Sequence, residues 1–351
     1  MPVIGWRGQP ARMNLVVEMR RALVVNCTKG RYNLAAYKML AWLPGQGYQV
    51  TFADGDPGPL FSYAYDLVAL SAIFSWDAPT ARNIALRVKG NSDVWAGGPG
   101  LAALSRWWMQ ETGLPCQAGI DPRFDRQPGA YHMTFASRGC PEGCWFCIVP
   151  KVEGRQFTLH WDFTPAPILL DNNLSALPVD FQKHIVSTYQ AAGMKLQAWS
   201  GFSPHYFDEA CYQRWKPVLQ PPWRLAFDEM QEADAVERAM RVLSGVRPRM
   251  TRVYVLVGNE PLASCYERVR KVIEWGGEPY VQRYRPLNYL GGPLPVRHDW
   301  TEAMLVDFSR YFNRYLWRRG VRLQEYTNRK NSRPLFADLA GTVSVDDGLR
   351  L

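Results

Sequence analysis

Strand-like and helix-like segments alternate along most of this chain of 351 residues, and they do so in two successive series. In the first series, four short strand-like segments lie at 22–26, 48–52, 66–74 and 93–96, and segments with helical spacing follow the first, third and fourth of them. Such alternation favours a parallel sheet, because parallel neighbours need a crossover connection, which is usually a helix. The chain is therefore predicted to be an α/β protein that begins with a doubly wound, Rossmann-like domain.

The second series starts after residues 117–130, whose prolines and glycines are typical of a linker. Six further strand-like segments follow, most of them with a helical segment behind, at 132–136, 168–171, 195–199, 224–227, 252–257 and 279–284. Six strand–helix units predict a partial (β/α)6 barrel of the TIM type, whose functional groups gather at the carboxyl ends of the strands. The expected domains are 1–116, the linker 117–130, the barrel 131–290 and a basic, mainly helical region 291–351.

Three of the seven cysteines are closely spaced, with the pattern C-x3-C-x2-C at Cys140, Cys144 and Cys147. A structural zinc site normally has four ligands, and neither Cys116 nor Cys211 belongs to a second C-x2-C pair. A disulfide is disfavoured by the odd cluster and by the absence of a secretion signal. Three thiolates can instead hold three irons of a cubane cluster and leave the fourth open, whereas an ordinary cubane takes four cysteines.

The cysteine run resembles the cluster loop of radical S-adenosylmethionine (SAM) enzymes, whose motif is C-x3-C-x-aromatic-C, with Phe146 in the aromatic position. The neighbouring residues resemble the subset with an extra domain before the radical domain, in particular Gly139, Pro141, Pro150, Gly154 and Arg155. The resemblance implies a 4Fe-4S cluster on the three cysteines and SAM on the open iron. It further implies reductive cleavage of SAM to a 5'-deoxyadenosyl radical, which abstracts hydrogen from a substrate.

The same resemblance assigns cofactor contacts to groups at the strand ends. Phe146 would lie against the adenine, and the residues after the second barrel strand would contact the methionyl amine; they are Asp171, Asn172 and Asn173. An Asp-Asn-Asn run also serves simply to end a strand and form a turn. Ser200, after the third strand, is expected near the ribose, and the fifth strand is followed by an adenine contact at Gly258 and Glu260.

Two branches of the family differ in how well they match. Methylthiotransferases carry three N-terminal cysteines for a second cluster, and this chain has only Cys27 and Cys116 there. Cobalamin-dependent members share the doubly wound N-terminal layout and often ligate cobalt with a histidine, but no histidine precedes His132. Cobalamin is therefore an additional cofactor that the layout allows. The chain has no run of eighteen apolar residues, so we expect no membrane partner. Seven cysteines and no export signal favour a cytoplasmic location. The resemblance also implies a one-electron donor such as flavodoxin or ferredoxin.

The formal net charge of +9 is concentrated in the last quarter, where residues 268–334 hold 14 Lys and Arg against 6 Asp and Glu. Residues 300–317 have helical spacing, which would place Arg310, Arg314 and Arg318 on one face, and Arg322 continues the charge. Arginines interleaved with aromatic residues suit nucleic-acid contact. A helix that closes the barrel, with its aromatic side chains inside and its arginines in water, explains the pattern equally well.

Three function classes remain, the first two of them implied by the resemblance. The first is a radical SAM enzyme that acts on a nucleic acid or a nucleotide. The second is a cobalamin-dependent radical SAM methyltransferase that acts on a small molecule or a peptide. The third is a non-catalytic iron–sulfur protein.

Overall fold

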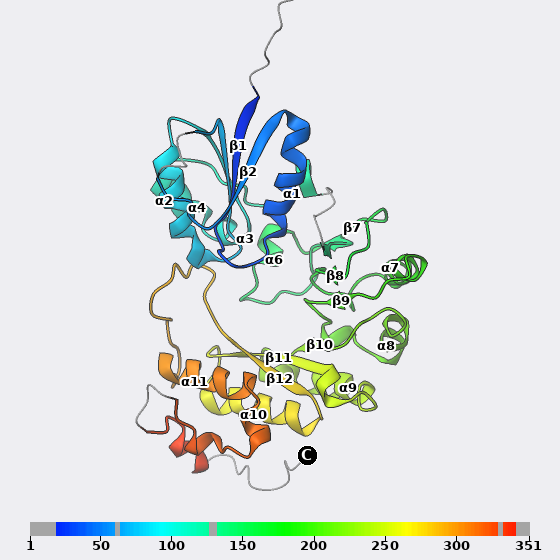
Figure 1. Cartoon of the computed structure of the whole chain (residues 1–351). Coiled ribbons are helices and arrows are strands. Elements are labelled where there is room, and N and C mark those ends of the chain that lie inside the picture. Colours follow the sequence, from blue (N-terminus) through cyan, green and yellow to red (C-terminus); the bar gives the residue numbers. More distant parts are fainter. Residues whose placement is uncertain (1–18, 60–63, 126–131, 329–332, 342–351) are drawn as a thin grey trace, which may run out of the picture.

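The computed structural model describes residues 19–59, 64–125, 132–328 and 333–341. Its N-terminal part is a parallel sheet with strand order β2-β1-β3-β4 (Figure 1). The strands are β1 (Arg20–Asn26), β2 (Tyr48–Asp54), β3 (Leu67–Ser71) and β4 (Asp93–Gly97), and the helices are α1 (Leu34–Trp42), α2 (Ala78–Val88), α3 (Pro99–Ala102) and α4 (Ser105–Thr112). The prediction of a parallel sheet is confirmed, with α1 between β1 and β2 and α2 between β3 and β4.

Both faces of this sheet are buried, and β1 shows how. Leu23 and Val25 pack in the cluster that includes α2 and α4, whereas Ala22 and Val24 pack in the cluster that includes α1. Successive residues of a strand point to opposite faces, so a strand between two helical layers must be apolar at every position. This explains why the apolar run at 22–25 has no polar alternation.

The C-terminal part contains two parallel three-stranded sheets that follow one another in chain order. Isolated parallel bridges between Leu196 and Leu219 and between Phe202 and Leu225 connect them. Within the described residues the first and last strands do not pair, so the arrangement is open. The strands are β5 (Met133–Thr134), β8 (Ile168–Leu169), β9 (Gln197–Ala198), β10 (Trp223–Ala226), β11 (Thr251–Val257) and β12 (Glu278–Arg283).

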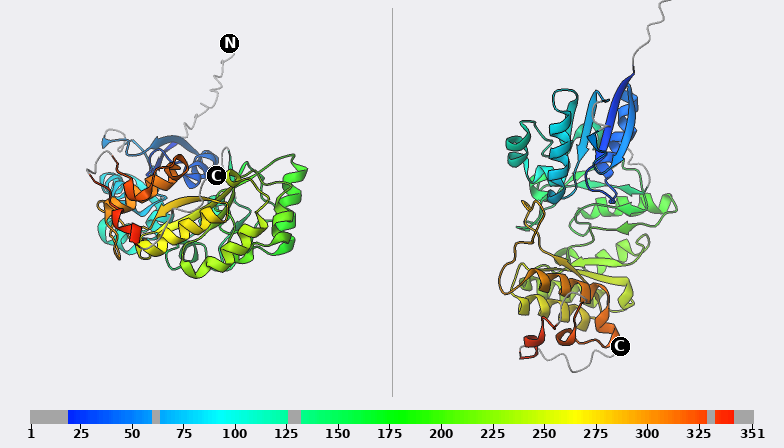
Figure 2. Two further views of the ribbon diagram at one scale, coloured as in Figure 1. Left: turned by 90° about the horizontal axis from the view of Figure 1, so that it is seen from below. Right: turned by 60° about the vertical axis from the view of Figure 1, so that its left-hand side comes forward.

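Helices cover one side of these strands and enclose a single hydrophobic core that runs from Ala136 to Leu339. The helices are α7 (Val179–Ala191), α8 (Glu209–Trp215), α9 (Ala233–Val242), α10 (Leu262–Glu274) and α11 (Glu302–Asn313). The chain between β12 and α11 rises to the N-terminal part and returns (Figure 1). Figure 2 shows the N-terminal sheet and the C-terminal helices at opposite ends of the molecule, with the central strands between them.

Several expected elements are shorter than predicted. The strands expected at 132–136 and 168–171 pair over only two residues each. The backbone N–H of Ala136 donates to the carboxylate of Asp171 instead of to a strand carbonyl, which ends the pairing there. The helix expected over residues 101–110 is divided between α3 and α4, because the backbone of Leu104 leaves the helical region (φ −118°).

The remaining elements are short. Residues 117–130 contain one helical turn, α5 (Pro122–Asp125), and the end of that expected linker lies outside the described residues. Two short strands form an antiparallel hairpin that the sequence did not indicate, β6 (Ser137–Arg138) and β7 (Thr158–Leu159), and α6 (Val149–Val152) lies between them. The 3-10 turns are η1 (Leu43–Gln46), η3 (Ser75–Asp77), η4 (Pro204–Tyr206), η5 (Met230–Glu232), η6 (Pro248–Met250), η7 (Leu316–Arg319), η8 (Leu323–Glu325) and η9 (Ala337–Gly341).

Candidate functional site

The hairpin β6–β7 closes the loop that carries the three cysteines. Inside the hairpin, the N–H of Cys140 donates to the carbonyl of Gly154 (3.2 Å), and the N–H of Gly139 donates to the carboxylate of Glu153 (3.0 Å). Gly139 has φ +90°, and a Cβ atom on it would lie 2.2 Å from the carbonyl oxygen of Gln156. The residue before the first cysteine must therefore be glycine if the loop is to keep this path.

The thiols of the loop are buried or half-buried, and hydrogen-bond donors lie beside two of the three sulfurs. The N–H of Val149 donates to the Sγ of Cys147 (3.4 Å), and the amide of Asn173 lies 4.0 Å from the Sγ of Cys140. Burial, and after it the neighbouring Cys147, raise the pKa of Cys144 to about 12. The pKa values of Cys140 and Cys147 are also raised, mainly by burial. Without a metal these thiols are protonated at neutral pH, and metal binding would displace their protons.

The donor set fits an iron–sulfur cluster in its chemistry. Thiolate is the preferred ligand of such clusters, and N–H donors to the sulfurs stabilise their negative charge and tune the reduction potential. Within the described part of the chain, no set of three or more Cys, His, Asp or Glu side chains surrounds a position for one metal ion. A cubane cluster distributes its cysteines over different irons, so its ligands need not converge on one point.

The cysteine loop lies across the carboxyl ends of the parallel strands. Glu142 accepts the hydroxyl proton of Ser203 (2.9 Å), which follows β9. The indole N–H of Trp145 donates to Glu229 (2.9 Å), which follows β10, and its ring packs 5.2 Å from that of Tyr284, which follows β12. The loop is therefore fixed at the edge where side chains from several strands converge.

The Asp-Asn-Asn run after β8 connects the cysteine loop to the neighbouring strand ends through hydrogen bonds. Asp171 is buried (1% exposed), and its carboxylate accepts from the N–H of Ala136 (2.8 Å) and the hydroxyl of Ser137 (2.5 Å). Asn172 donates to Glu153 (2.7 Å), and Asn173 accepts from the backbone N–H of Ser203 (3.3 Å), which follows β9. These contacts give the run a structural role, and its contact with SAM stays a prediction.

The other predicted cofactor residues lie at the same edge but differ in accessibility. Ser200 is exposed and donates to the carbonyl of Leu170 (3.3 Å). Gly258 has φ +88°, and a Cβ atom there would lie 2.9 Å from the side chain of Leu305. Glu260 forms an ion pair with Arg268 (2.9 Å), whereas Phe146 lines a large cavity.

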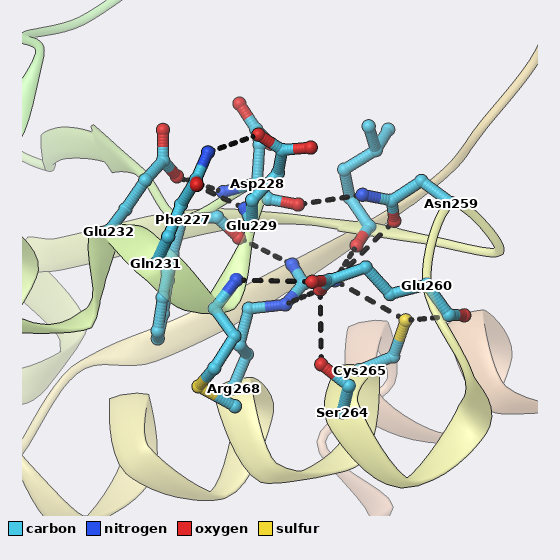
Figure 3. Close-up of polar contacts among 12 residues, drawn as sticks. Phe227, Asp228, Glu229, Gln231, Glu232, Asn259, Glu260, Ser264, Cys265 and Arg268 are labelled. Carbon is cyan, nitrogen blue, oxygen red and sulfur yellow. Dashed lines mark hydrogen bonds and ion pairs between the residues drawn. The ribbon is translucent and has the colours of Figure 1, made fainter.

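Arg268 is a buried residue that the sequence reasoning missed. Its side chain is fully buried, and it donates to the carbonyl oxygens of Phe227 (2.6 Å) and Leu256 (2.8 Å) as well as pairing with Glu260 (Figure 3). One guanidinium thus ties the ends of β10 and β11 together. The position was visible in the spacing, because Arg268 comes three residues after Cys265 on the apolar face of α10.

Asp228, which follows β10, carries a second unusual carboxylate. Its pKa is raised to about 7, first by burial and then by the negative charge of Glu232, while Arg268 lowers it. Figure 3 shows these carboxylates above Arg268, with the side chain of Asn259 donating to the backbone carbonyl of Asp228 (2.8 Å). The edge of the sheet beside the cysteine loop is therefore rich in acids held out of water.

A cavity of about 1670 Å³ lies between the N-terminal sheet and the cysteine loop. Its N-terminal wall comes from the segments after β1, β3 and β4, and its other wall includes Phe146, Asn172, Trp199 and Tyr284. In a sheet of order 2-1-3-4 the connections diverge between β1 and β3, and open parallel sheets bind ligands at that switch point. The volume exceeds the 300–1,000 Å³ or so of an ordinary ligand pocket, so the cavity has room for a large cofactor or for two ligands.

The predicted arginine face is wrong. Helix α11 ends at Asn313, and Tyr315 has a left-handed backbone (φ 56°), so Arg318 lies in the separate turn η7 and not on the face of Arg310 and Arg314. Arg318 pairs with Glu278 (2.8 Å). Arg314 and Arg322 are exposed, Arg310 is half-buried, and the aromatic rings of the helix, Tyr311 and Phe312, are buried. This agrees with the alternative arrangement, in which the aromatic residues close the core.

No protein-family model and no curated protein matches the chain. Among the described residues, no helix combines the length and the apolar character that crossing a membrane requires.

The glycine before Cys140 gives a direct test of the loop geometry. Gly139→Ala adds a Cβ atom against a fixed backbone oxygen, whereas Gly154→Ala adds one where no atom lies within 4 Å, at a similar φ of +87°. We expect Gly154→Ala to lower the unfolding free energy by about 1–2 kcal/mol for the backbone conformation alone. Gly139→Ala should cost more and also reduce the iron retained per chain. Thermal unfolding and iron analysis of the pair check this, and equal behaviour would contradict it.

Asp171 gives a pH test. Burial raises its pKa to about 7, from roughly 3.9 in the unfolded chain. Between these values the folded state binds the additional proton, so the contribution of Asp171 to the unfolding free energy falls as pH rises from about 4 to about 7, on the order of a few kcal/mol. Asp171→Asn removes this contribution and keeps an acceptor for the N–H of Ala136. Urea unfolding across this range should show a flatter pH dependence in the variant; an unchanged slope would show that Asp171 does not titrate in this way.

Proposed function

We propose that this protein is a radical SAM enzyme with an N-terminal doubly wound domain and a partial (β/α)6 barrel. The observation that carries the proposal is the placement of the C-x3-C-x2-C loop across the carboxyl ends of the parallel strands, held by Glu142 and Trp145. When bound there, a 4Fe-4S cluster supplies the electron that cleaves SAM to methionine and a 5'-deoxyadenosyl radical. The proposal includes the domain limits 1–116, 117–130, 131–290 and 291–351, a cytoplasmic location and a flavodoxin- or ferredoxin-type electron donor.

The chain's own residues hold and shield this chemistry. Cys140, Cys144 and Cys147 supply the thiolates, and the N–H groups of Val149 and Asn173 stabilise their charge. Under the proposal, SAM lies between the loop and the strand ends, against Phe146, Asn172, Asn173, Ser200, Gly258 and Glu260. The walls of the cavity then keep water from the reactive carbon of the substrate.

A second candidate is a cobalamin-dependent methyltransferase, and the size and place of the cavity favour it. The cavity opens on the switch point of the N-terminal sheet and continues to Phe146 of the cysteine loop. None of the described residues that line it is a histidine. Cobalamin would therefore bind without a histidine ligand from this wall, and its retention would show as a corrinoid absorption spectrum.

Anaerobic reconstitution with iron and sulfide tests the cluster itself. We expect about four irons per chain and, after reduction, an electron paramagnetic resonance signal that changes when SAM is added, because SAM would bind the open iron. A signal that SAM leaves unchanged would favour the non-catalytic iron–sulfur protein. Zinc in place of iron after the same treatment would contradict both readings.

A further inference from the structure

The residues that line the cavity include more basic than acidic side chains. Seven Lys and Arg side chains line it, against four Asp and Glu. Three of the acids are engaged within the wall: Asp121 pairs with Arg123 (2.5 Å), Asp125 pairs with Arg138 (2.5 Å), and Glu153 accepts from its neighbours in the cysteine loop. The fourth, Asp77, accepts the hydroxyl proton of Thr28 and has no cation within ion-pair distance in the described part.

Four of the lining cations have no acidic partner within 4.0 Å among the described residues. Lys29 and Arg31 lie in the connection from β1 to α1, on the N-terminal wall. Arg283 ends β12, and Arg285 follows two residues later on the opposite wall. Burial lowers the pKa of Arg285, and the charge of Arg283 lowers it further. Two like charges at one wall of a cavity, with no acid between them, are unfavourable unless an anion is present.

Arg285 is held in place by an aromatic contact and has no ion pair within the described residues. Its guanidinium lies 4.3 Å from the ring centroid of Trp76, which is itself stacked on Phe74 (4.3 Å). Ser75 fixes this turn to the other half of the molecule through the carbonyl of Tyr289 (2.6 Å). The buried Nε of Arg285 has no hydrogen-bond partner among the described residues, which costs free energy unless a ligand supplies an acceptor.

We propose that this cavity binds a phosphorylated small molecule, whose phosphate contacts Arg283 and Arg285, with Lys29 and Arg31 adding positive potential. The inference rests on the proposed function, because it names the substrate class of the radical reaction. A phosphate ester carries a charge of about −1.5 to −2 and three acceptor oxygens, which suits an arginine pair better than a single carboxylate does. Arginine binds phosphate through two parallel N–H donors. The aromatic residues Trp199 and Tyr280 in the same wall suit a ring on that molecule.

Calorimetric titration of the full chain, as purified, tests the inference independently of cluster loading. The probes are pyrophosphate, adenosine and guanosine 5'-monophosphate, the matching uncharged nucleosides, and citrate. We expect the nucleotides to bind and the nucleosides to bind much more weakly. Arg283→Gln/Arg285→Gln should weaken nucleotide binding roughly 10- to 100-fold. The matched control Arg247→Gln/Arg249→Gln removes two exposed charges with the same spacing outside the cavity and should bind as the parent does.

Four outcomes would overturn the inference. They are the absence of binding by any phosphate probe, equal loss in both double variants, and binding of citrate as tight as that of the nucleotides. The fourth is loss of phosphate binding once hydroxocobalamin is bound, which would assign the arginines to the phosphate of that cofactor. Iron content after reconstitution is measured on the same samples. A protein that binds nucleotides but no cluster would refute the proposed function and leave the phosphate site standing.

Discussion

Replacement of any one of Cys140, Cys144 and Cys147 by alanine is expected to reduce 5'-deoxyadenosine formation more than roughly 100-fold. Loss of a group that only orients a metal ligand already costs about 10–100-fold in affinity or activity, and here a ligand itself is removed. Burial keeps the thiols of this loop protonated in the absence of metal. Two remaining thiols are therefore expected to bind iron only weakly. Iron per chain should fall in parallel with activity.

The matched control is Cys211→Ala. Cys211 is also buried, but it lies in α8 within the hydrophobic core, away from the cysteine loop. Its replacement removes a small core group, and iron content and deoxyadenosine formation should stay near those of the parent. If Cys211→Ala lost as much iron as Cys144→Ala, the C-x3-C-x2-C run would not be the cluster site.

Arg268→Met is expected to lower the unfolding free energy by about 3–5 kcal/mol, the usual effect of breaking a buried ion pair. The change leaves the carbonyl oxygens of Phe227 and Leu256 without their donor and Glu260 without its cation. The melting temperature should fall by roughly 5–15 °C. Adding Glu260→Gln should recover part of the loss, because the carboxylate then no longer carries an unpaired charge.

The control for this prediction is Arg241→Met on the neighbouring helix α9. The side chain of Arg241 is 74% exposed, and its pair with Glu237 spans one helical turn. An exposed pair of this kind contributes about 0.3–0.5 kcal/mol. Differential scanning fluorimetry of both variants gives the comparison. Similar melting temperatures for the two would show that Arg268 does not tie the ends of β10 and β11 together.

Much of the fold was predictable because its strongest signals are local. Residues 22–25 are all apolar since both faces of β1 are buried, and the helical segment that forms α2 carries 3.6-residue spacing. Elements that depend on distant side chains were less predictable. The length of β5 depends on the carboxylate of Asp171, 35 residues from its partner Ala136. The end of α11 depends on the left-handed Tyr315, for which the sequence has no glycine signal.

The candidate site was also predictable only where its signals are local in the sequence. The cysteine motif and the polar strand ends are sequence signals, and the structure brings Asn172 and Asn173 to the loop that the motif defines. The burial of Arg268 could not be predicted from its residue type, since a basic residue in a helix is usually exposed. The cavity with Arg283 and Arg285 could not be predicted, because its walls come from segments some 200 residues apart in the chain and meet only in the folded protein.

The central claim is that the cysteine loop supports reductive cleavage of SAM. The most direct measurement is chromatographic detection of 5'-deoxyadenosine after the anaerobically reconstituted, reduced protein is mixed with SAM. The account predicts product that requires both reductant and iron and that is absent from Cys144→Ala. A protein that holds its cluster, accepts an electron and still forms no 5'-deoxyadenosine, with or without a phosphorylated substrate, would contradict it.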